Sequence, residues 1–373
     1  MRVLILEDDP WIADLLKQIV LSLRPGARVD CQGRVADAIA AWQREPAQMV
    51  IADWNLPDGS GTRLLQAVRS QDREVALVMI TSRADRDSVL EVRPLGISAF
   101  ISKPFQVPKV LDCLRRLLPG DDAPAPAAPS DRDFLGHLAA LPDEEIDLPL
   151  SAELCQQLQD TSDAPANLQQ LGDLWQHDPA VQARLVAAAN SPLYNSAGQP
   201  CSNLADAVRR LGAATALNLV QGLALRPVAR LQDADLHSLG EGLLQTQLSV
   251  RQRVTELARA CQLDPAPLQC AALLQRMGEL AVLQQAQIWR GRGLELHEDQ
   301  LQRALRQHSS ELANRLKAHW RLPIVLRELI GACYGLAPGN TRREPILMRL
   351  AVAELQNADS QEVQRLRRLA GLS

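Results

Sequence analysis

Acidic, hydroxyl and ammonium side chains stand at four separate points within the first 105 residues. Residues 7–9 read Glu-Asp-Asp, and Asp53 stands alone after an apolar segment. Carboxylates gathered in one place repel one another and need a cation between them, and oxygen ligands without histidine or thiolate suit Mg²⁺. A carboxylate beside Mg²⁺ can act as a nucleophile towards a phosphoryl group. Thr81 and Lys103 add a hydroxyl and an ammonium that can hold phosphoryl oxygens.

Short apolar runs that are typical of buried strands lead into these four points. The expected strands are residues 3–6, 49–52, 75–80 and 99–101, and a weaker strand over residues 27–31 brings their number to five. Apolar residues at three- and four-residue spacing predict helices over residues 10–23, 35–42, 61–69 and 87–95. This alternation indicates an α/β domain with a doubly wound parallel sheet. The carboxyl ends of its strands meet at one edge, where such sheets bind ligands, so the four points are expected to converge there.

The combination of these motifs, in this order, resembles the receiver domain of two-component response regulators. It is carried by residues 6–10 (Leu-Glu-Asp-Asp-Pro), 52–61 (Ala-Asp-Trp-Asn-Leu-Pro-Asp-Gly-Ser-Gly), 80–82 (Ile-Thr-Ser) and 100–105 (Phe-Ile-Ser-Lys-Pro-Phe). A single strand-end aspartate can equally be a mere helix cap; the whole set is far more specific. The resemblance covers residues 1–118 and implies a five-stranded sheet in the order 2-1-3-4-5.

The resemblance assigns a role to each of these side chains. Asp53 is implied as the phosphoacceptor, and Mg²⁺ is implied to be held by Glu7, Asp8, Asp53 and the backbone carbonyl of Asn55. Asp9 is the alternative to Asp8; Glu7 and Asp8 are preferred because the apolar strand leads directly into them.

Three further residues complete the implied receiver site. Thr81 and Lys103 are implied to contact the phosphoryl group. Phe100 is implied to be the rotating aromatic of a switch that it forms with Thr81. The Lys103-Pro104 peptide bond is expected to be cis, as bonds before proline in tight turns often are.

A change of composition separates this domain from the rest of the chain. Residues 119–133 hold several prolines among alanine, aspartate and serine and have almost nothing to bury. We expect a semi-extended linker over residues 119–140. Residues 141–373 show long helical patterns without a convincing strand, so this part is expected to be all-α. Its glutamine pairs, such as Gln284-Gln285, are expected on helix surfaces.

Residues 176–194 and 202–212 carry the strongest local pattern of the second part. Asp178-Pro179 predicts a helix start, Asn190-Ser191 a helix end, and Gly212 a tight turn into the next helix. This stretch resembles the HDOD domain, an all-α relative of the metal-dependent HD phosphohydrolases. The resemblance extends over residues 147–340.

The metal ligands of the HD phosphohydrolases are missing at the corresponding places. Gln275-Arg276 stands where a His-Asp doublet is expected, and Gln247 lies on the helix that should carry the first histidine. A guanidinium cannot bind a metal, and an amide binds it poorly. His177 is explained by the helix start beside it. The histidines downstream of it lack a carboxylate at ligand spacing; they are His237, His297, His308 and His319. We therefore expect no metal in the HDOD domain.

The net charge and the amino-acid composition argue against two classes of protein and indicate a location. A net charge of −4 and 3% aromatic residues argue against nucleic-acid binding. No segment approaches the roughly 20 apolar residues of a membrane span, and seven scattered cysteines without a CxxC pair fit reduced core thiols in the cytoplasm.

The expected function is that of a response regulator. It would take a phosphoryl group from a sensor histidine kinase or phosphotransfer protein and signal through a non-catalytic HDOD domain to an unknown protein partner, with a homodimer as a further possibility. The alternatives are a residual metal-dependent phosphohydrolase acting on nucleotides or cyclic dinucleotides, and a DNA-binding transcriptional regulator.

Overall fold

The computed structural model describes residues 1–82, 92–118, 133–160, 168–226, 228–356 and 361–372, with the backbone alone at 159–160 and 168–171. The chain forms two compact units. The first comprises residues 1–127 and 213–227, and the second comprises residues 128–212 and 228–373. Each unit is built around its own set of buried residues.

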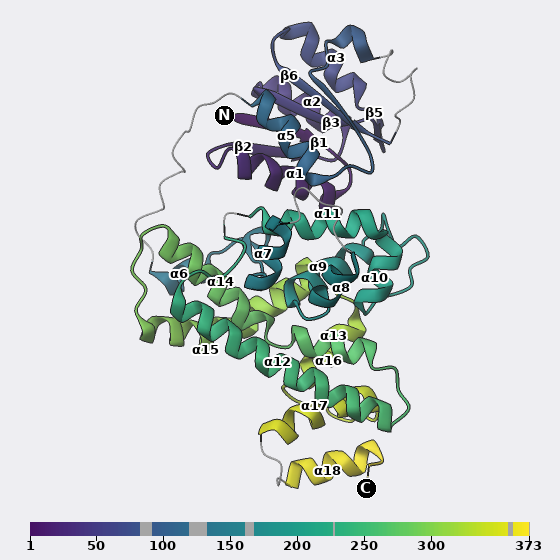
Figure 1. Cartoon of the computed structure of the whole chain (residues 1–373), viewed down its shortest axis with the longest axis vertical. Helices are drawn as coiled ribbons and strands as arrows, with labels where there is room; N and C mark the ends of the chain where they lie inside the picture. Colours follow the sequence, from purple (N-terminus) through teal and green to yellow (C-terminus); the bar gives the residue numbers. More distant parts are fainter. Residues whose placement is uncertain (83–91, 119–132, 161–167, 227, 357–360, 373) are drawn as a thin grey trace. The chain divides into compact units, whose positions relative to one another are not determined.

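A five-stranded parallel sheet forms the centre of the first unit (Figure 1). Its order is β2-β1-β3-β6-β7, which confirms the expected order 2-1-3-4-5. The strands are β1 (Arg2–Leu6), β2 (Arg28–Gln32), β3 (Met49–Asp53), β6 (Ala76–Thr81) and β7 (Ala99–Ser102). The short strands β4 (Asn55–Leu56) and β5 (Gly59–Ser60) pair antiparallel in the loop after β3.

Helices cover both faces of this sheet, because alternate residues of each central strand point in opposite directions. Val3 and Ile5 pack in a core with α1 (Pro10–Leu23) and α5 (Val107–Leu117). Leu4 and Leu6 pack in a second core with α2 (Val35–Arg44) and α3 (Thr62–Gln71). Of the helix expected over residues 87–95, residues 87–91 lie outside the described residues and Arg93–Leu95 form a 3-10 turn, η1.

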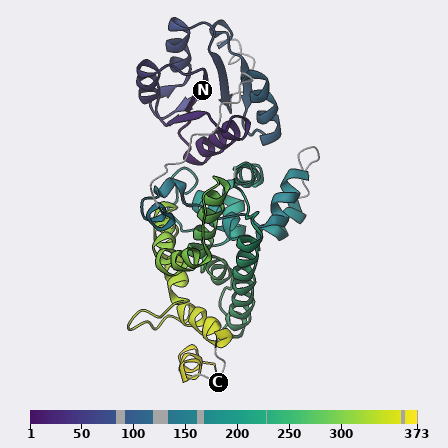
Figure 2. The same cartoon turned by 90° about the vertical axis from the view of Figure 1, so that its left-hand side faces the viewer.

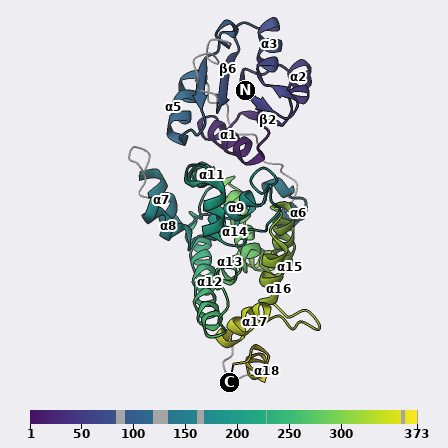
Figure 3. The same cartoon turned by 90° about the vertical axis from the view of Figure 1, so that its right-hand side faces the viewer.

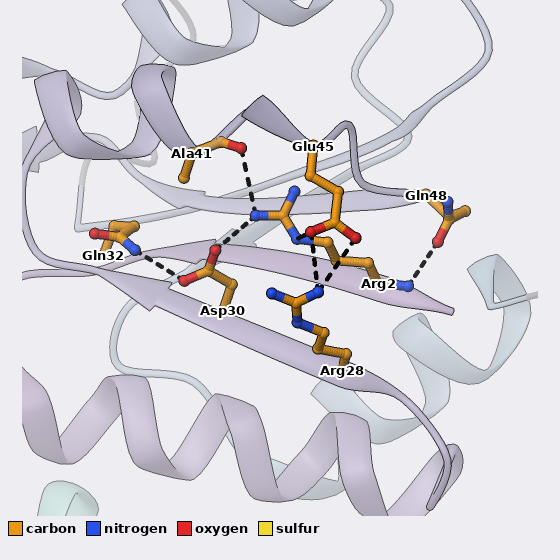
Figure 4. A network of polar contacts seen from close by, with 7 residues as sticks. All are labelled: Arg2, Arg28, Asp30, Gln32, Ala41, Glu45 and Gln48. Carbon is orange, nitrogen blue, oxygen red and sulfur yellow. Dashed lines mark hydrogen bonds and ion pairs between the residues drawn. The ribbon is translucent and has the colours of Figure 1, made fainter. Parts of the chain in front are cut away.

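A buried arginine begins β1, one residue before the start that the apolar run suggested. The Nη2 of Arg2 donates to Asp30 Oδ2 of β2 at 2.6 Å, and its main-chain N–H donates to Gln48 Oε1 at 2.6 Å (Figure 4). Burial opposes the charged form of Asp30, but hydrogen bonds from Arg2 and Gln32 outweigh it and lower the pKa of Asp30. The ion pair therefore lets a charged residue occupy a buried strand position.

Helices alone make up the regular structure that is described in the second unit. Its longer helices are α9 (Pro179–Ala189), α12 (Ala234–Ala260), α14 (Met277–Gly291), α15 (Glu298–His319) and α17 (Arg343–Gln356). Its shorter helices are α6 (Phe134–Ala139), α7 (Ala152–Asp160), α8 (Leu168–Trp175), α10 (Leu204–Leu211), α13 (Ala266–Leu274), α16 (Ile324–Ala332) and α18 (Gln361–Ala370), with a 3-10 turn η2 (Asp143–Glu145).

The helices of this unit pack against one another in pairs. Helix α12 contacts α13 and α17, and α14 contacts α15 (Figure 3). At the C-terminal end of the chain, α18 packs against α17 (Figure 2). Asp178 caps α9 by accepting from the Val181 N–H at 3.0 Å, Pro179 is its first residue and Asn190 ends it. These caps confirm the expected helix start and end.

Two expectations about this half differ from the structure. The pair Gln284-Gln285 is buried rather than on the surface, because the side-chain amides donate to the main-chain carbonyls of Val228 and Glu145. Residues 119–132 of the expected linker lie outside the described residues, whereas α6 occupies most of its last part. Phe134 of α6 is buried edge-on against Trp289 with 5.6 Å between ring centroids, so the helical structure starts before residue 141.

The seven cysteines are all free, but only four of them are buried. Cys31 is exposed, and Cys113 and Cys261 are half-buried, so the expected core location is wrong for these three. Among the described residues, no helix has both the length and the apolar character needed to cross a membrane.

Candidate functional site

The side chains singled out in the receiver-like sequence meet at the carboxyl edge of the sheet. Asp53 is the last residue of β3 and Thr81 the last of β6. Glu7 and Asp8 follow β1 directly, and Lys103 follows β7. The parallel register aligns these strand ends, with Asp53 beside Ile80 and Thr81 beside Ser102. The sheet therefore brings together groups that lie up to 96 positions apart in the chain.

Lys103 joins two of the carboxylates. Its Nζ donates to Glu7 Oε2 at 2.7 Å and to Asp53 Oδ2 at 2.8 Å. The Lys103-Pro104 bond is cis, as expected, and the Lys103 N–H donates to the Thr81 carbonyl at 2.7 Å. Burial disfavours the charged form of Lys103, but the Glu7 and Asp53 carboxylates outweigh it and raise the pKa of this lysine.

The acidic cluster carries more negative charge than one lysine compensates. Glu7, Asp8 and Asp53 each place a carboxylate oxygen within 4.8 Å of the others. Burial, opposed by Lys103 and reinforced by Asp53, raises the pKa of Glu7 to about 7. Burial followed by the charge of Asp53 also raises the pKa of Asp8. An oxygen-only cluster whose charge is disfavoured in this way fits a hard divalent cation such as Mg²⁺.

Asp9 has a different task from its two neighbours. Its side chain accepts a hydrogen bond from the Trp11 N–H at 2.9 Å and forms the N-cap of α1. It lies outside the group of three carboxylates. The geometry thus places Glu7 and Asp8, rather than Asp9, beside Asp53.

The loop after β3 holds Asp53 from the other side. Asp53 Oδ1 accepts from the Trp54 N–H at 2.6 Å, and the Gly61 N–H donates to the Trp54 carbonyl at 2.9 Å. A Cβ added to Gly61 would lie only 1.9 Å from the main-chain oxygen of Asp53, so this position requires glycine. Asn55 is exposed and pairs with Ser60 between β4 and β5.

Asp58 is a structural residue of this loop that the sequence reasoning missed. Its carboxylate accepts hydrogen bonds from the Val35 N–H at 2.9 Å and the Ala36 N–H at 3.1 Å, at the start of α2. These hydrogen bonds hold the pKa of Asp58 below its usual range. Arg34, the residue before α2, makes no side-chain cap of its own. The absence of a capping residue at that point of the sequence was the signal that a cap must come from elsewhere.

The two expected switch residues lie on neighbouring strands. Thr81 is fully buried at the end of β6. Phe100 of β7 is half-buried beside Met79 and packs against the core under α2 and α3. Thr81 therefore lies beside the Lys103 main chain, and Phe100 lies two strand positions before Ser102, the last residue of β7.

At two positions of the missing HD ligands, an amide and a guanidinium make other contacts. Gln247 is fully buried and its Nε2 donates to the Leu273 carbonyl, which joins α12 to α13. Arg276 pairs with Glu279 at 2.9 Å. Among the residues described here, the cluster around Asp53 is the only group of three or more acidic, histidine or cysteine side chains with metal-ligand spacing.

Comparisons with known proteins match both parts of the chain. Residues 148–335 match the HDOD domain family, and residues 3–115 match the response regulator receiver domain family. Response regulator protein PilR of Pseudomonas aeruginosa is 27% identical over 135 residues, which is 36% of this chain and 30% of PilR. Chemotaxis protein CheY of the same organism is 26% identical over 107 residues, 28% of this chain and 86% of CheY.

Two solved structures resemble the chain in part. The non-phosphorylated HemR receiver domain from Leptospira biflexa is 26% identical and covers 33% of this chain and 98% of its own, with a TM-score of 0.30. A fragment of the MmoQ response regulator from Methylococcus capsulatus is 19% identical and covers 61% of this chain and 92% of its own, with a TM-score of 0.47. The match spans less than a third of PilR and about half of the Bacillus subtilis regulator DctR.

Proposed function

Because the chain belongs to the HDOD family and carries a response-regulator receiver domain ahead of its HDOD domain, we propose that it is phosphorylated on Asp53 and reports this state through the HDOD domain. The observation that supports the site most directly is the carboxylate of Asp53, held 2.8 Å from the Lys103 ammonium beside two further acids. The donor would be a sensor histidine kinase or a phosphotransfer protein.

The transfer itself requires few protein groups. An oxygen of Asp53 attacks the phosphorus atom of a phosphohistidine, the new O–P bond forms, and the N–P bond of the donor breaks as imidazole leaves. When bound by Glu7, Asp8, Asp53 and the Asn55 carbonyl, Mg²⁺ would neutralise charge on the phosphoryl oxygens. Lys103 is already aimed at Asp53 and has to exchange its carboxylate partners for a phosphoryl oxygen.

The signal would begin with Thr81 and Phe100. The Thr81 hydroxyl is expected to move towards the phosphoryl group, and Phe100 is expected to turn into the space it leaves. Because Lys103 lies between β7 and α5, the outer surface of the receiver domain is expected to change without a change of fold. The output would be altered contact with a partner protein or a second copy of the chain.

We propose that the HDOD domain is not a hydrolase. The replacement of potential metal ligands by Gln247, Gln275 and Arg276 supports this. Free cysteines throughout the chain support a cytoplasmic location, where thiols stay reduced.

Peptide mass spectrometry of the full chain after incubation with acetyl phosphate and MgCl₂ tests the phosphorylation proposal. We expect one hydroxylamine-sensitive phosphate on the peptide that holds Asp53, and none when EDTA replaces MgCl₂. A phosphate on any other residue would contradict the assignment. Elemental analysis of the same protein tests the HDOD proposal, since stoichiometric manganese, iron, nickel or zinc would support the hydrolase instead.

A further inference from the structure

One helix that belongs to the HDOD match in sequence forms part of the first compact unit. Helix α11 (Ala213–Ala224) lies within residues 148–335, the span of the HDOD match. The structure nevertheless groups residues 213–227 with the receiver domain, where α11 contacts α1 and α5. Figures 1 and 3 both show α11 alongside α1. The expected HDOD range of residues 141–373 is therefore interrupted by a segment that packs with the receiver domain.

The contacts of this segment come from α11 and from the turn that follows it. Asn218 and Gly222 lie four positions apart on one face of the helix, and Leu225 and Arg226 come directly after its last residue, Ala224. Leu225 packs against the core under α1 and α5. A Cβ added to Gly222 would lie 2.7 Å from Leu15 Cδ1, so glycine allows α11 to approach α1 closely. Arg226 pairs with Asp14 at 3.1 Å.

The remaining contact leads towards the phosphorylation site. Asn218 is 6% exposed, and its Nδ2 donates to the main-chain carbonyl of Phe105 at 2.9 Å. Phe105 follows the cis Lys103-Pro104 pair directly. The Lys103 ammonium in turn contacts Glu7 and Asp53. Only Pro104 and Phe105 therefore lie between Lys103 and the main-chain carbonyl that accepts the hydrogen bond from Asn218 of α11.

We propose that α11 is the element that reads the state of Asp53, and that its docking on α1 and α5 is released by phosphorylation. This inference rests on the proposed function and names the surface through which it acts. In the arrangement described, Asn218 is satisfied by the Phe105 carbonyl while Lys103 holds Glu7 and Asp53. A phosphoryl group on Asp53 gives Lys103 a new partner and shifts the main chain that carries this carbonyl. Asn218 is buried and cannot turn to water instead, so docking becomes weaker.

Coupling between two sites is reciprocal, which gives the proposal a second consequence. If phosphorylation weakens the docking of α11, a variant with weaker docking must bind the phosphoryl mimic more tightly. Asn218→Ala removes the hydrogen bond to Phe105, and Arg226→Ala weakens docking without touching that carbonyl. Gly222→Leu forces α11 away from Leu15. Its matched control is Gly242→Leu, because Gly242 lies in α12 with nothing within 4 Å of an added Cβ.

Hydrogen–deuterium exchange of the full chain tests the release directly. The phosphoryl mimic is beryllofluoride with MgCl₂. Its binding is followed independently by the change in tryptophan fluorescence, to which Trp54, buried next to Asp53, contributes. We expect amides of residues 213–224 to exchange roughly fivefold faster or more with beryllofluoride, the lower end of typical coupling. We also expect Asn218→Ala, Arg226→Ala and Gly222→Leu to bind beryllofluoride more tightly, with Gly242→Leu like wild type.

The possible failures separate the two proposals. If beryllofluoride does not bind the wild-type chain, the proposed function fails and this inference fails with it. If it binds but leaves the exchange of residues 213–224 unchanged or slower, the release is refuted while the phosphorylation site stands. Unchanged beryllofluoride affinity in both Arg226→Ala and Gly222→Leu would refute the coupling, even if Asn218→Ala does not fold.

Discussion

Replacing Glu7 by glutamine is expected to stabilise the first unit when divalent cations are absent. The side chain of Glu7 is 2% exposed, and it shares one ammonium with Asp53. Burial therefore disfavours its charged form more strongly than Lys103 favours it, and raises its pKa to about 7. Glutamine keeps the shape of the side chain and can still accept from Lys103, but carries no charge.

The size and the pH range of the effect follow from this pKa. The ordinary pKa of a glutamate is 4.5, and burial raises that of Glu7 to about 7. Each unit of this pKa difference corresponds to about 1.4 kcal/mol in the free energy of unfolding. Because the folded-state value is the higher one, the protonated carboxyl contributes stability that is fully present below about pH 4.5 and is lost as the pH rises through about 7. At pH 8 the free energy of unfolding of the glutamine variant should therefore be roughly 3 kcal/mol higher than that of wild type.

Urea unfolding in EDTA measures this difference, with hydrogen exchange of the β1 and β3 peptides as the readout of unfolding. With a urea slope of about 2 kcal/mol/M, the midpoint should rise by roughly 1.5 M at pH 8 and by little at pH 4.5. Glu74→Gln, at an exposed glutamate, is the matched control and should change neither midpoint. Added MgCl₂ should stabilise wild type more than Glu7→Gln. A Glu7→Gln variant that is less stable than wild type at pH 8 in EDTA would refute the reasoning.

Three further substitutions test other parts of the structure. Gly61→Ala should displace the main chain at Asp53 and lower the rate of phosphorylation by acetyl phosphate at least roughly tenfold, because two atoms 1.9 Å apart must separate; wild-type rates would contradict the close approach. Lys103→Ala should leave Mg²⁺ affinity intact in a titration while slowing phosphorylation, and equal loss of both would show that the lysine acts on folding instead. Phe134→Ala should cost the second unit about 3 kcal/mol and speed the exchange of α14 amides near Trp289; an unchanged melting temperature and unchanged exchange would exclude α6 from the core.

The parallel sheet could be predicted from the sequence because its central strands, β1, β3 and β6, are buried on both faces. They therefore read as apolar runs, such as residues 3–6 and 49–52, whereas the partly exposed edge strand β2 gives a weaker signal. The carboxyl edge followed from this sheet, and with it the meeting of Glu7, Asp53 and Lys103. What the pattern missed was Arg2, since a charge at a buried strand position makes sense only with its ion pair to Asp30 in view.

Contacts between distant segments could not be predicted in the same way. The sequence of α11 is rich in alanine and leucine like the other helices of its half, and periodicity does not tell which surface such a helix covers. The decisive features are the single amide of Asn218 and the missing Cβ of Gly222, which acquire meaning only opposite Phe105 and Leu15. Gln284 and Gln285 were misplaced for a similar reason, because their main-chain partners lie 56 and 140 positions away.

The identity of the phosphoacceptor is the central claim, and phosphate incorporation by Asp53→Asn tests it most directly. The amide is a far poorer nucleophile than the carboxylate, while its size and its contact with Trp54 are preserved. Intact-mass spectrometry of the full chain after incubation with acetyl phosphate and MgCl₂ should show one phosphate on wild type and on Asp37→Asn, an exposed control in α2. It should show none on Asp53→Asn. Phosphate incorporation by Asp53→Asn equal to that of wild type would contradict the account.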